Sequence, residues 1–347
     1  MTPSPLLLPA VPFYAAAVAA RNAAYRLGIL KTRKAPLPVI SVGNLTAGGT
    51  GKTPFVAWLA RALAADGRRP SILSRGYRPL ETVPPSNVTG PANDETLELA
   101  ALLPDVPIFC DPDRLRSATR ARKAGADVAI LDDGFQHRRI ARDLDIVLVS
   151  ATEGFGNDRL LPAGALREPV RALARAHLIL LTRADLTEAS ALPPLRERIR
   201  RINPVPLLEA RHAPEDLMPL TGGDPLPAHG FAGRRTHLCC GLGDPRAFRT
   251  TASRLGMVVA SASLFPDHHT YRADDIAGVA AAARRSGATV ILTTGKDAVK
   301  IRREWLPDIP FFALRITLRL TAGEATLRER LNTLLINNHF RDTSGGI

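Results

Sequence analysis

A glycine-rich segment, residues 42–54, reads VGNLTAGGTGKTP and joins two stretches of different pattern. Residues 38–42 before it are apolar and rich in β-branched side chains, which is typical of a buried strand, and residues 55–64 after it have the spacing of an amphipathic helix. A loop between a buried strand and a helix N-terminus directs backbone N–H groups and the positive end of the helix dipole at one point. The segment therefore predicts a phosphate-binding loop that holds a nucleoside triphosphate.

Single residues of this loop suit that role. The glycines let the backbone close around phosphates, Lys52 can reach the β- and γ-phosphate oxygens, and the Thr53 hydroxyl can ligate Mg²⁺. The usual motif G-x-x-x-x-G-K-[ST] has a glycine where this chain has Thr46, and an ordinary tight turn between strand and helix is the alternative interpretation. The residues expected to contact the nucleotide are Thr46, Ala47, Gly48, Gly49, Thr50, Gly51, Lys52 and Thr53.

The rest of the chain alternates between apolar strand-like and amphipathic helix-like segments. Strands are expected at 38–42, 71–74, 128–131, 146–150, 178–181, 237–240, 258–261, 290–293 and 311–314, and helices at 52–66, 245–255, 274–286 and 323–335. This order predicts an α/β fold, with a parallel sheet of the P-loop NTPase type covered by helices on both faces and a second, smaller α/β domain. We expect an N-terminal helix in residues 1–34, a kinase-type domain in 35–220, a linker at 221–230 and the smaller domain in 231–347, with a cleft between the two domains.

The charge of the chain points to an anionic partner. Its 347 residues include 46 Lys and Arg against 33 Asp and Glu, a formal net charge of +13, which suits nucleic acid, an acidic membrane or a phosphorylated substrate. Aromatic residues make up only 5% of the chain and are not interleaved with a basic stretch, so nucleic acid is not expected as a partner. Three cysteines, Cys110, Cys239 and Cys240, form neither a disulfide framework nor a C-x-x-C metal pair.

The N-terminal segment has the composition of a membrane-interface helix. Residues 6–20 are almost wholly apolar, but they are too few to span a bilayer and two prolines interrupt them. The cations that follow are Arg21, Arg26, Lys31, Arg33 and Lys34. An apolar helix flanked by cations is typical of a helix lying on an anionic membrane surface. The alternative is a helix that packs on the first domain with its basic residues in solvent.

A second chemical signal is AILDDGFQHRR, residues 129–139. A strand that ends in Asp132 and Asp133 puts two carboxylates at the C-terminal edge of the sheet, beside the phosphate loop, where they could hold Mg²⁺. They could instead cap the next element. The following Gln136, His137 and Arg138 could contact an anionic substrate, although a solvated basic loop explains them as well.

Several strings in this chain resemble one family. The strings VGNLTAGGTGKTP, ILSRGY, DDGFQHR, LLPAGALREP, FPDHHTY and LTTGKDAVK, in this order and spacing, are similar to those of the tetraacyldisaccharide 4′-kinases, also called lipid A 4′-kinases. The resemblance implies transfer of the γ-phosphate of ATP, with Mg²⁺, to the 4′-hydroxyl of an acylated diglucosamine 1-phosphate. It also implies a peripheral or monotopic enzyme on the cytoplasmic face of the Gram-negative inner membrane, whose surface would be a partner.

The resemblance also implies roles for particular residues. Lys52 and Thr53 match the family's phosphate loop, and Asp132 and Asp133 its metal pair. The family's general base lies in a G-D-E-P string, which corresponds to Asn93-Asp94-Glu95-Thr96 here, so Asp94 takes the position of the base. His268 matches the histidine that pairs with that aspartate, and Arg167 and Glu168 match an R-E-P string expected near the phosphates or the sugar.

Asp94 has an alternative role, one residue departs from the family pattern, and two other functions are alternatives. Asp94 could simply be the N-cap of a helix that begins at Glu95, and Gly295 stands where the family pattern T-E-K-D has a glutamate. The rival function is a regulatory ATPase of the deviant P-loop type, associated with a membrane or DNA, but such proteins carry an early lysine where this chain has Ala47. A carboxylate-activating synthetase with the same loop would not explain the N-terminal helix.

Overall fold

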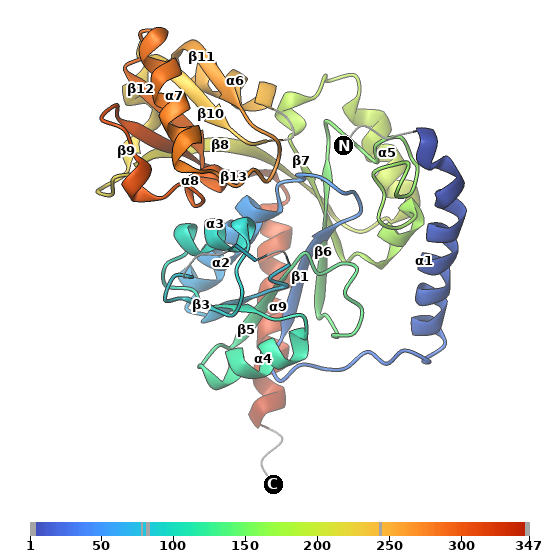
Figure 1. The fold of residues 1–347 in the computed structure, drawn as a ribbon. Coiled ribbons are helices and arrows are strands. Elements are labelled where there is room, and N and C mark those ends of the chain that lie inside the picture. The colour runs from blue at the N-terminus through green and yellow to red at the C-terminus, as the bar shows by residue number, and fades with distance from the viewer. Residues whose placement is uncertain (1–4, 78, 81–83, 243–244, 344–347) are drawn as a thin grey trace.

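The computed structural model describes residues 5–77, 79–80, 84–242 and 245–343, which form an α/β structure with two lobes (Figure 1). The strands are β1 Val39–Asn44, β2 Pro70–Ser74, β3 Val88–Thr89, β4 Ile108–Cys110, β5 Val128–Asp132, β6 Leu144–Ser150, β7 Leu178–Thr182, β8 Leu207–Pro219, β9 Leu226–Pro227, β10 Arg235–Cys240, β11 Val258–Leu264, β12 Val290–Thr294 and β13 Phe311–Ala322. The α-helices are α1 Val11–Arg26, α2 Lys52–Ala65, α3 Asp94–Leu102, α4 Arg114–Lys123, α5 Leu192–Ile202, α6 Pro245–Arg254, α7 Ala273–Arg285, α8 Gly295–Ala298 and α9 Glu324–Thr343. Short 3-10 helices are η1 Pro5–Ala10, η2 Val170–Arg175, η3 Ala184–Leu186, η4 Ala228–Phe231 and η5 Arg303–Trp305.

The strands of the described part of the chain form one sheet, in the order β11-β10-β12-β13-β8-β7-β6-β1-β5-β2-β4-β3, with β9 paired to β8. The strands from β8 to β3 are mutually parallel and belong to the large lobe. The strands from β11 to β13 are also mutually parallel and belong to the small lobe. The two halves meet where β8 and β13 pair antiparallel. The predicted parallel sheet and the second α/β unit are therefore both present, within a continuous sheet.

The register of β8 and β13 makes the carboxyl edges of the two halves face each other. Residues 207–210 of β8 pair with β7 in the large lobe, and residues 209–219 pair with β13, so the carboxyl-terminal part of β8 extends into the small lobe. Residues 311–314 of β13 pair with β12, and the strand then continues back to the large lobe. Because functional groups of parallel sheets collect at carboxyl edges, residues from both lobes can meet between them.

Helices cover both faces of the sheet. In the large lobe, α2, α3 and α9 pack against one face, in a core that includes Phe55, Leu99 and Leu331. On the other face α5 covers Val147 and Ile179, and α4 lies over the neighbouring strands. In the small lobe α6 and α7 enclose separate clusters on the two faces. β1 is buried along its whole length, as the β-branched run before the glycine-rich segment predicts.

The C-terminal part of the chain differs from the expected division. α9 packs its leucines on the core of the large lobe, so the last helix of the chain does not belong to the small lobe (Figure 1). Residues 221–230 do not connect the lobes, because β9 pairs with β8 and Ala228 is buried in the small lobe. The connections are β8 and β13. The division into domains at 35–220 and 231–347 stays a prediction, with this correction to the place of the linker.

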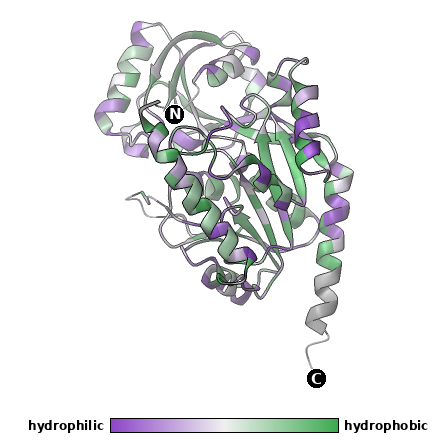
Figure 2. Ribbon diagram, turned by 90° about the vertical axis from the view of Figure 1, so that its right-hand side faces the viewer, coloured by the Kyte–Doolittle hydropathy of each residue, from purple (hydrophilic) through white to green (hydrophobic). Residues whose placement is uncertain are grey.

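The N-terminal helix α1 lies along the large lobe (Figure 1). Val18 is buried, the Tyr14 hydroxyl donates to the Arg167 carbonyl at 3.0 Å, and Asn22 donates to Glu168 at 2.9 Å. Its other face is open to solvent and exposes Phe13. The ribbon of the helix includes both hydrophobic and hydrophilic residues (Figure 2). No helix in the described residues is long and apolar enough to cross a bilayer.

Candidate active site

The glycine-rich loop has the predicted position between β1 and α2. Gly51 is the N-cap of α2 and has a left-handed backbone, with φ of 86°. A Cβ at this position would also collide with the imidazole of His212, so a side chain there would be strained and would displace His212. The loop is fixed from behind, because the Ala47 N–H donates to the Ala165 carbonyl at 2.6 Å and the Thr182 hydroxyl donates to the Thr50 carbonyl at 2.9 Å.

The backbone conformation of Thr46 explains why this loop has no glycine at the first glycine position of the motif. Its backbone is not among the left-handed residues, so the conformation does not call for glycine there. The residue is buried and forms an isolated antiparallel bridge with Leu166. The side-chain amide of Asn44 also donates to its carbonyl at 2.7 Å. Thr46 thus ties the loop to the segment that carries Arg167.

Lys52 and the two aspartates meet at the carboxyl edge of the large lobe. Lys52 Nζ lies 3.5 Å from Asp133 Oδ1 and 3.3 Å from Asn44 Oδ1. Arg167 Nη1 donates to Asp133 Oδ2 at 2.7 Å. Burial alone would raise the pKa of Asp133, but Lys52 and Arg167 lower it to about 2. Asp133 is therefore a fixed anion between two cations.

Asp132 has the opposite electrostatic environment. Its side chain is buried, and burial together with the nearby charges of Glu95 and Asp133 raises its pKa to about 7, against the opposing effect of Lys52 and Arg114. A divalent cation would relieve this excess of negative charge. The donors available are the Thr53 hydroxyl and two carboxylates, and oxygen donors are what Mg²⁺ prefers.

The described residues contain no cluster of three or more His, Cys, Asp or Glu that could enclose a metal ion. This agrees with Mg²⁺ chemistry, because Mg²⁺ is usually held by one or two carboxylates, waters and the substrate phosphates. At this edge, in the described part of the chain, the buried Thr50 Oγ1 lacks a hydrogen-bond partner, and Asp133 Oδ1 faces only the Lys52 ammonium group at 3.5 Å. The residues present therefore fit a phosphate group with its cation.

A second constellation joins the two lobes. Asp94, at the first position of α3, is buried, and its Oδ2 lies 2.8 Å from Nδ1 of His268, which follows β11 of the small lobe. Asn93 is the N-cap of α3, since its side chain accepts from the Thr96 N–H at 2.9 Å. The alternative that Asp94 itself caps this helix is therefore wrong. His268 has a left-handed backbone, with φ of 61°, which is uncommon outside glycine.

Lys296 completes this constellation from α8. Its Nζ lies 2.8 Å from Asp267 Oδ1, 3.4 Å from His268 Nε2 and 3.8 Å from Asp94 Oδ2. Burial opposes the charge of this ammonium group, but the hydrogen bond and charge of Asp267, with Asp94 and Glu95, raise its pKa above the ordinary value. Glu95 acts on both Lys296 and Asp132, so both constellations share one electrostatic environment.

The remaining predicted residues have different surroundings. Gln136 Nε2 donates to the Asn44 carbonyl at 2.9 Å, beneath the phosphate loop. Burial and the neighbouring Arg114 and Arg142 lower the pKa of His137 to about 4, so this imidazole is neutral. The guanidinium of Arg138 lies 4.9 Å from the Tyr25 ring centre, against α1.

Glu168 does not accompany Arg167 at the phosphate loop. It is fully buried, and its carboxylate accepts from Arg175 at 2.9 and 3.0 Å and from Asn22 of α1 at 2.9 Å. Its partners lower its pKa despite burial, which by itself would raise it. The structure therefore brings Asp133 and Arg167 together and directs Glu168 towards the N-terminal helix. His269 is likewise local, stacked on Phe265 and bonded to Asp275 at 3.0 Å.

Arg114 is a site residue that the sequence analysis did not single out. It is buried, donates to the Asp111 carbonyl at 2.8 Å, and has a pKa lowered to about 10 by burial, with the charge of Asp132 opposing this shift. Burying an arginine charge is destabilising unless a group of opposite charge lies close to it. For Arg114 this group is Asp132. The available signal was its place in DPDRLR, directly after the short apolar run of β4.

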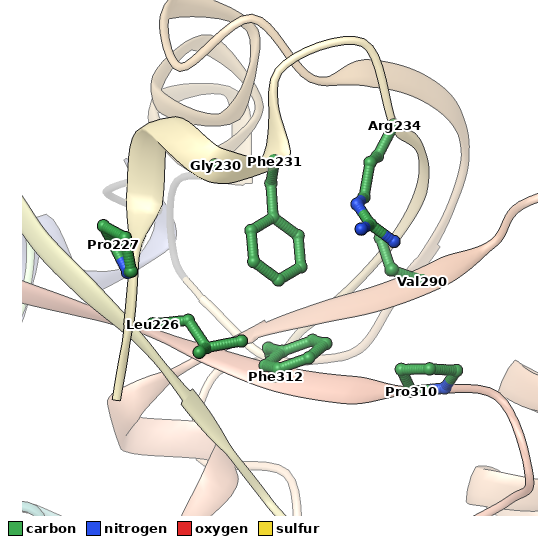
Figure 3. Close-up of a pocket in the computed structure, with 8 residues that line it drawn as sticks. All are labelled: Leu226, Pro227, Gly230, Phe231, Arg234, Val290, Pro310 and Phe312. Atoms are coloured by element: carbon green, nitrogen blue, oxygen red, sulfur yellow. The ribbon is translucent and has the colours of Figure 1, made fainter. Parts of the chain in front are cut away.

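One apolar pocket lies elsewhere. It has a volume of about 310 Å³ and is lined by side chains that include Leu226, Phe231 and Phe312 (Figure 3). Val290 and Pro310 place it at the amino ends of β12 and β13, whereas Lys296 follows the carboxyl end of β12. The pocket is therefore at the edge of the small lobe opposite to the active-site residues.

Comparisons with known proteins agree on one family. The family model for tetraacyldisaccharide-1-P 4′-kinase matches residues 3–336. A tetraacyldisaccharide 4′-kinase of Anaeromyxobacter sp. is 40% identical, over 99% of this chain and 94% of that protein. One of Geobacter metallireducens is 40% identical, over 83% and 86%. A crystal structure of LpxK from Aquifex aeolicus in complex with ATP is 32% identical, covers 95% of this chain and 98% of that one, and superposes with a TM-score of 0.73.

Proposed function

The chain belongs to the tetraacyldisaccharide-1-P 4′-kinase family, and from this premise we propose which of its residues carry out phosphoryl transfer. The enzyme is a kinase of lipid A biosynthesis that phosphorylates the 4′-hydroxyl of a lipid disaccharide with ATP. The rival function, a regulatory ATPase, is not favoured by these relatives. The finer substrate, an acylated diglucosamine 1-phosphate, is part of the proposal.

We assign the nucleotide phosphates to the loop from Thr46 to Thr53. Lys52 would neutralise charge on the β- and γ-phosphates, and Thr53 and Asp132 would hold Mg²⁺, which supplies further neutralisation of the transferring group. Asp133 keeps Lys52 and Arg167 in position, because it lies between these two cations. Arg167 thereby comes to the edge of the phosphate loop, where a guanidinium can stabilise charge that develops during transfer.

Asp94 is assigned as the general base for the 4′-hydroxyl. It is buried at a carboxyl edge, and His268 Nδ1 at 2.8 Å orients it and takes up part of its charge. This contact between residues 174 positions apart in the chain is the observation that carries the assignment, since it joins the two lobes at one carboxylate. Gln136 and His137 remain candidates for substrate contact, while Arg138 and Glu168 are assigned to the docking of α1.

We also propose that α1 and the segment after it lie on an anionic membrane, at the cytoplasmic face of the Gram-negative inner membrane. Large apolar side chains there are exposed, Phe13 by 79%, Leu27 by 74% and Ile29 by 71%. The exposed cations Arg26, Lys31, Arg33 and Lys34 stand beside them. An acylated substrate resides in a bilayer, so an interfacial patch on the enzyme would bring the site to its substrate.

The base assignment is tested by a double-mutant cycle. Asp94→Asn should lower kcat by about 10²- to 10⁴-fold with little change in the KM for ATP, because it removes a proton acceptor and leaves the phosphate loop intact. His268→Ala should act through the same carboxylate, so the double variant should lose little more than the worse single variant. The matched control is His269→Ala, whose imidazole contacts Asp275 instead. Fully multiplicative losses would contradict a shared role.

A further inference from the structure

The ammonium group of Lys296 lies against the Asp94–His268 pair but takes no part in the assigned mechanism. Lys296 is on α8 of the small lobe, and its side chain is 17% exposed. Nζ lies 2.8 Å from Asp267 Oδ1, 3.4 Å from His268 Nε2 and 3.8 Å from Asp94 Oδ2. The distance to Asp94 is too long for a hydrogen bond. Lys296 therefore reaches Asp94 through His268, to which it is hydrogen-bonded.

The chemistry of these contacts fixes the roles of the two ring nitrogens of His268. A lysine ammonium group has only donors, so Nε2 must be the acceptor in the contact with Lys296. The ring proton is then on Nδ1, which donates to Asp94 Oδ2 at 2.8 Å. An ionised carboxylate has only acceptors, so the contact with Asp94 requires a proton on the same nitrogen. Both contacts are satisfied by one neutral imidazole.

Asp267 is an anion that would favour a second proton on this ring. Its Oδ2 lies 3.9 Å from His268 Nε2. Lys296 opposes this effect in two ways, because it occupies Nε2 and also forms an ion pair with Asp267 at 2.8 Å. Burial by itself would raise the pKa of Asp267, but the hydrogen bond from Lys296 and its charge lower that pKa. The Asp267 carboxylate therefore stays charged and holds the ammonium group in place.

The protonation of the ring matters for the basicity of Asp94. An imidazolium beside a carboxylate stabilises the charged form of that carboxylate, which then has less affinity for the proton of a hydroxyl group. A neutral imidazole still orients the carboxylate through its Nδ1–H group but withdraws less of its charge. A general base paired with His268 is therefore stronger while the ring carries a single proton.

We propose that Lys296 is a positioning residue that keeps His268 a neutral donor to Asp94. In the transfer step, Asp94 takes the proton of the 4′-hydroxyl while the hydroxyl oxygen bonds to the γ-phosphorus and ADP leaves. His268 keeps its own proton on Nδ1 throughout. This role rests on the proposed assignment of Asp94 as the base.

Kinetics of Lys296→Met in the full-length enzyme test the role, because methionine has nearly the length of lysine but no donor. kcat should fall about 10- to 100-fold, the loss typical for partners that orient histidines in metal sites. The KM for ATP should change little, and in the His268→Ala background Lys296→Met should have no further effect. Lys123→Met, at an exposed position of α4, is the matched control. A raised KM for ATP, with a loss that persists without His268, would overturn the proposal in favour of direct contact with the nucleotide.

Nitrogen NMR of the histidine rings gives a readout that a merely structural role would not change. The signals of His268 can be assigned by their absence from His268→Ala. Near neutral pH, Nε2 should be unprotonated in the parent enzyme, and Lys296→Met should raise the fraction of rings with protons on both nitrogens. Unchanged His268 signals in Lys296→Met would contradict the proposal, whatever the loss of activity.

Chemical rescue separates the charge of Lys296 from its size. The cysteines Cys110, Cys239 and Cys240 are buried, so in folded Lys296→Cys an alkylating reagent should react at position 296. Bromoethylamine adds an ammonium group there at nearly the length of lysine and should restore most of the lost kcat. Iodoacetamide adds a neutral amide of similar size and is the matched control. Equal recovery with both reagents would overturn a role for the charge.

The Asp94→Asn variant separates this inference from the base assignment. Parental activity of Asp94→Asn would overturn the base assignment and with it this role of Lys296. Loss of activity in Asp94→Asn, together with a parental kcat in folded Lys296→Met, would overturn the role of Lys296 alone.

Discussion

Lys52 lies at the first position of α2, with its ammonium group near Asn44 and Asp133. Lys52→Ala should lower kcat by about 10²- to 10³-fold, the usual loss when one group that stabilises transition-state charge is removed. The melting temperature should change little, because Asp133 keeps its ion pair with Arg167. Lys123→Ala, an exposed lysine in the last turn of α4, is the matched control. Near-normal turnover by folded Lys52→Ala would contradict the role given to the loop.

Candidate site residues were predictable from the sequence where they belong to one short, continuous motif. The loop from Thr46 to Thr53 and the pair Asp132 and Asp133 could be placed because strand, loop and helix follow one another directly in the chain. The pairing of Asp94 with His268 was implied by the family resemblance, not by spacing, since 174 positions separate them. Arg114 was missed, because burial near Asp132 determines its properties and burial is not visible in one sequence.

At the scale of elements, α1 has a docked face and a free face. The docked face is held by Asn22 and Tyr14, and the free face presents Phe13 to solvent. Arg26→Glu/Lys31→Glu should weaken binding to anionic vesicles by at least about 2 kcal/mol, roughly 30-fold, since each basic residue near such a surface contributes about 1 kcal/mol. Binding should also decrease with added salt. Vesicle flotation measures both effects.

The control for this prediction leaves α1 unchanged and reverses two charges elsewhere. Arg122→Glu/Lys123→Glu makes the same charge reversal on exposed positions of α4, far in sequence from the N-terminal segment, and should leave flotation unchanged if the N-terminal segment is the binding surface. Equal losses in both double variants would show that net charge, and not α1, determines binding. Arg21 is excluded from the test because it lies 3.7 Å from Glu168 and belongs to the docked face.

Most strands were predictable, because their residues are buried on both faces and form continuous apolar runs. β8 was missed, since its sequence LLEARHAPEDLMP mixes charges and prolines, and only its first residues show the expected run. Such a strand is stabilised by its partners: Arg315 of β13 forms an ion pair with Asp216, and the two strands pair over most of their length. Pairing between distant segments leaves little trace in local periodicity.

At the scale of the whole molecule, the two lobes share two strands, β8 and β13. β8 and β13 run through both halves of the sheet, and the chain returns after β13 to place α9 on the core of the large lobe (Figure 1). From the sequence alone, elements that follow one another in the chain are expected to lie in the same domain. The last helix was therefore assigned to the second domain. The observed topology instead places α9 in the lobe that carries the glycine-rich loop.

This topology predicts that the protein unfolds as a unit. Leu331 of α9 is 2% exposed and packs in the same core as Phe55 of the helix that follows the phosphate loop. Leu331→Ala should lower the free energy of unfolding by about 2–5 kcal/mol, the usual loss for a leucine buried in a core. Because α9 also follows directly from β13, the loss should appear in a single transition in which both lobes unfold together. Arg330→Ala, at an exposed position of the same helix, should change the free energy of unfolding by no more than about 0.5 kcal/mol. Calorimetry measures the transition, and two separate transitions, with only one shifted by Leu331→Ala, would show that the lobes are independent in spite of the strands they share.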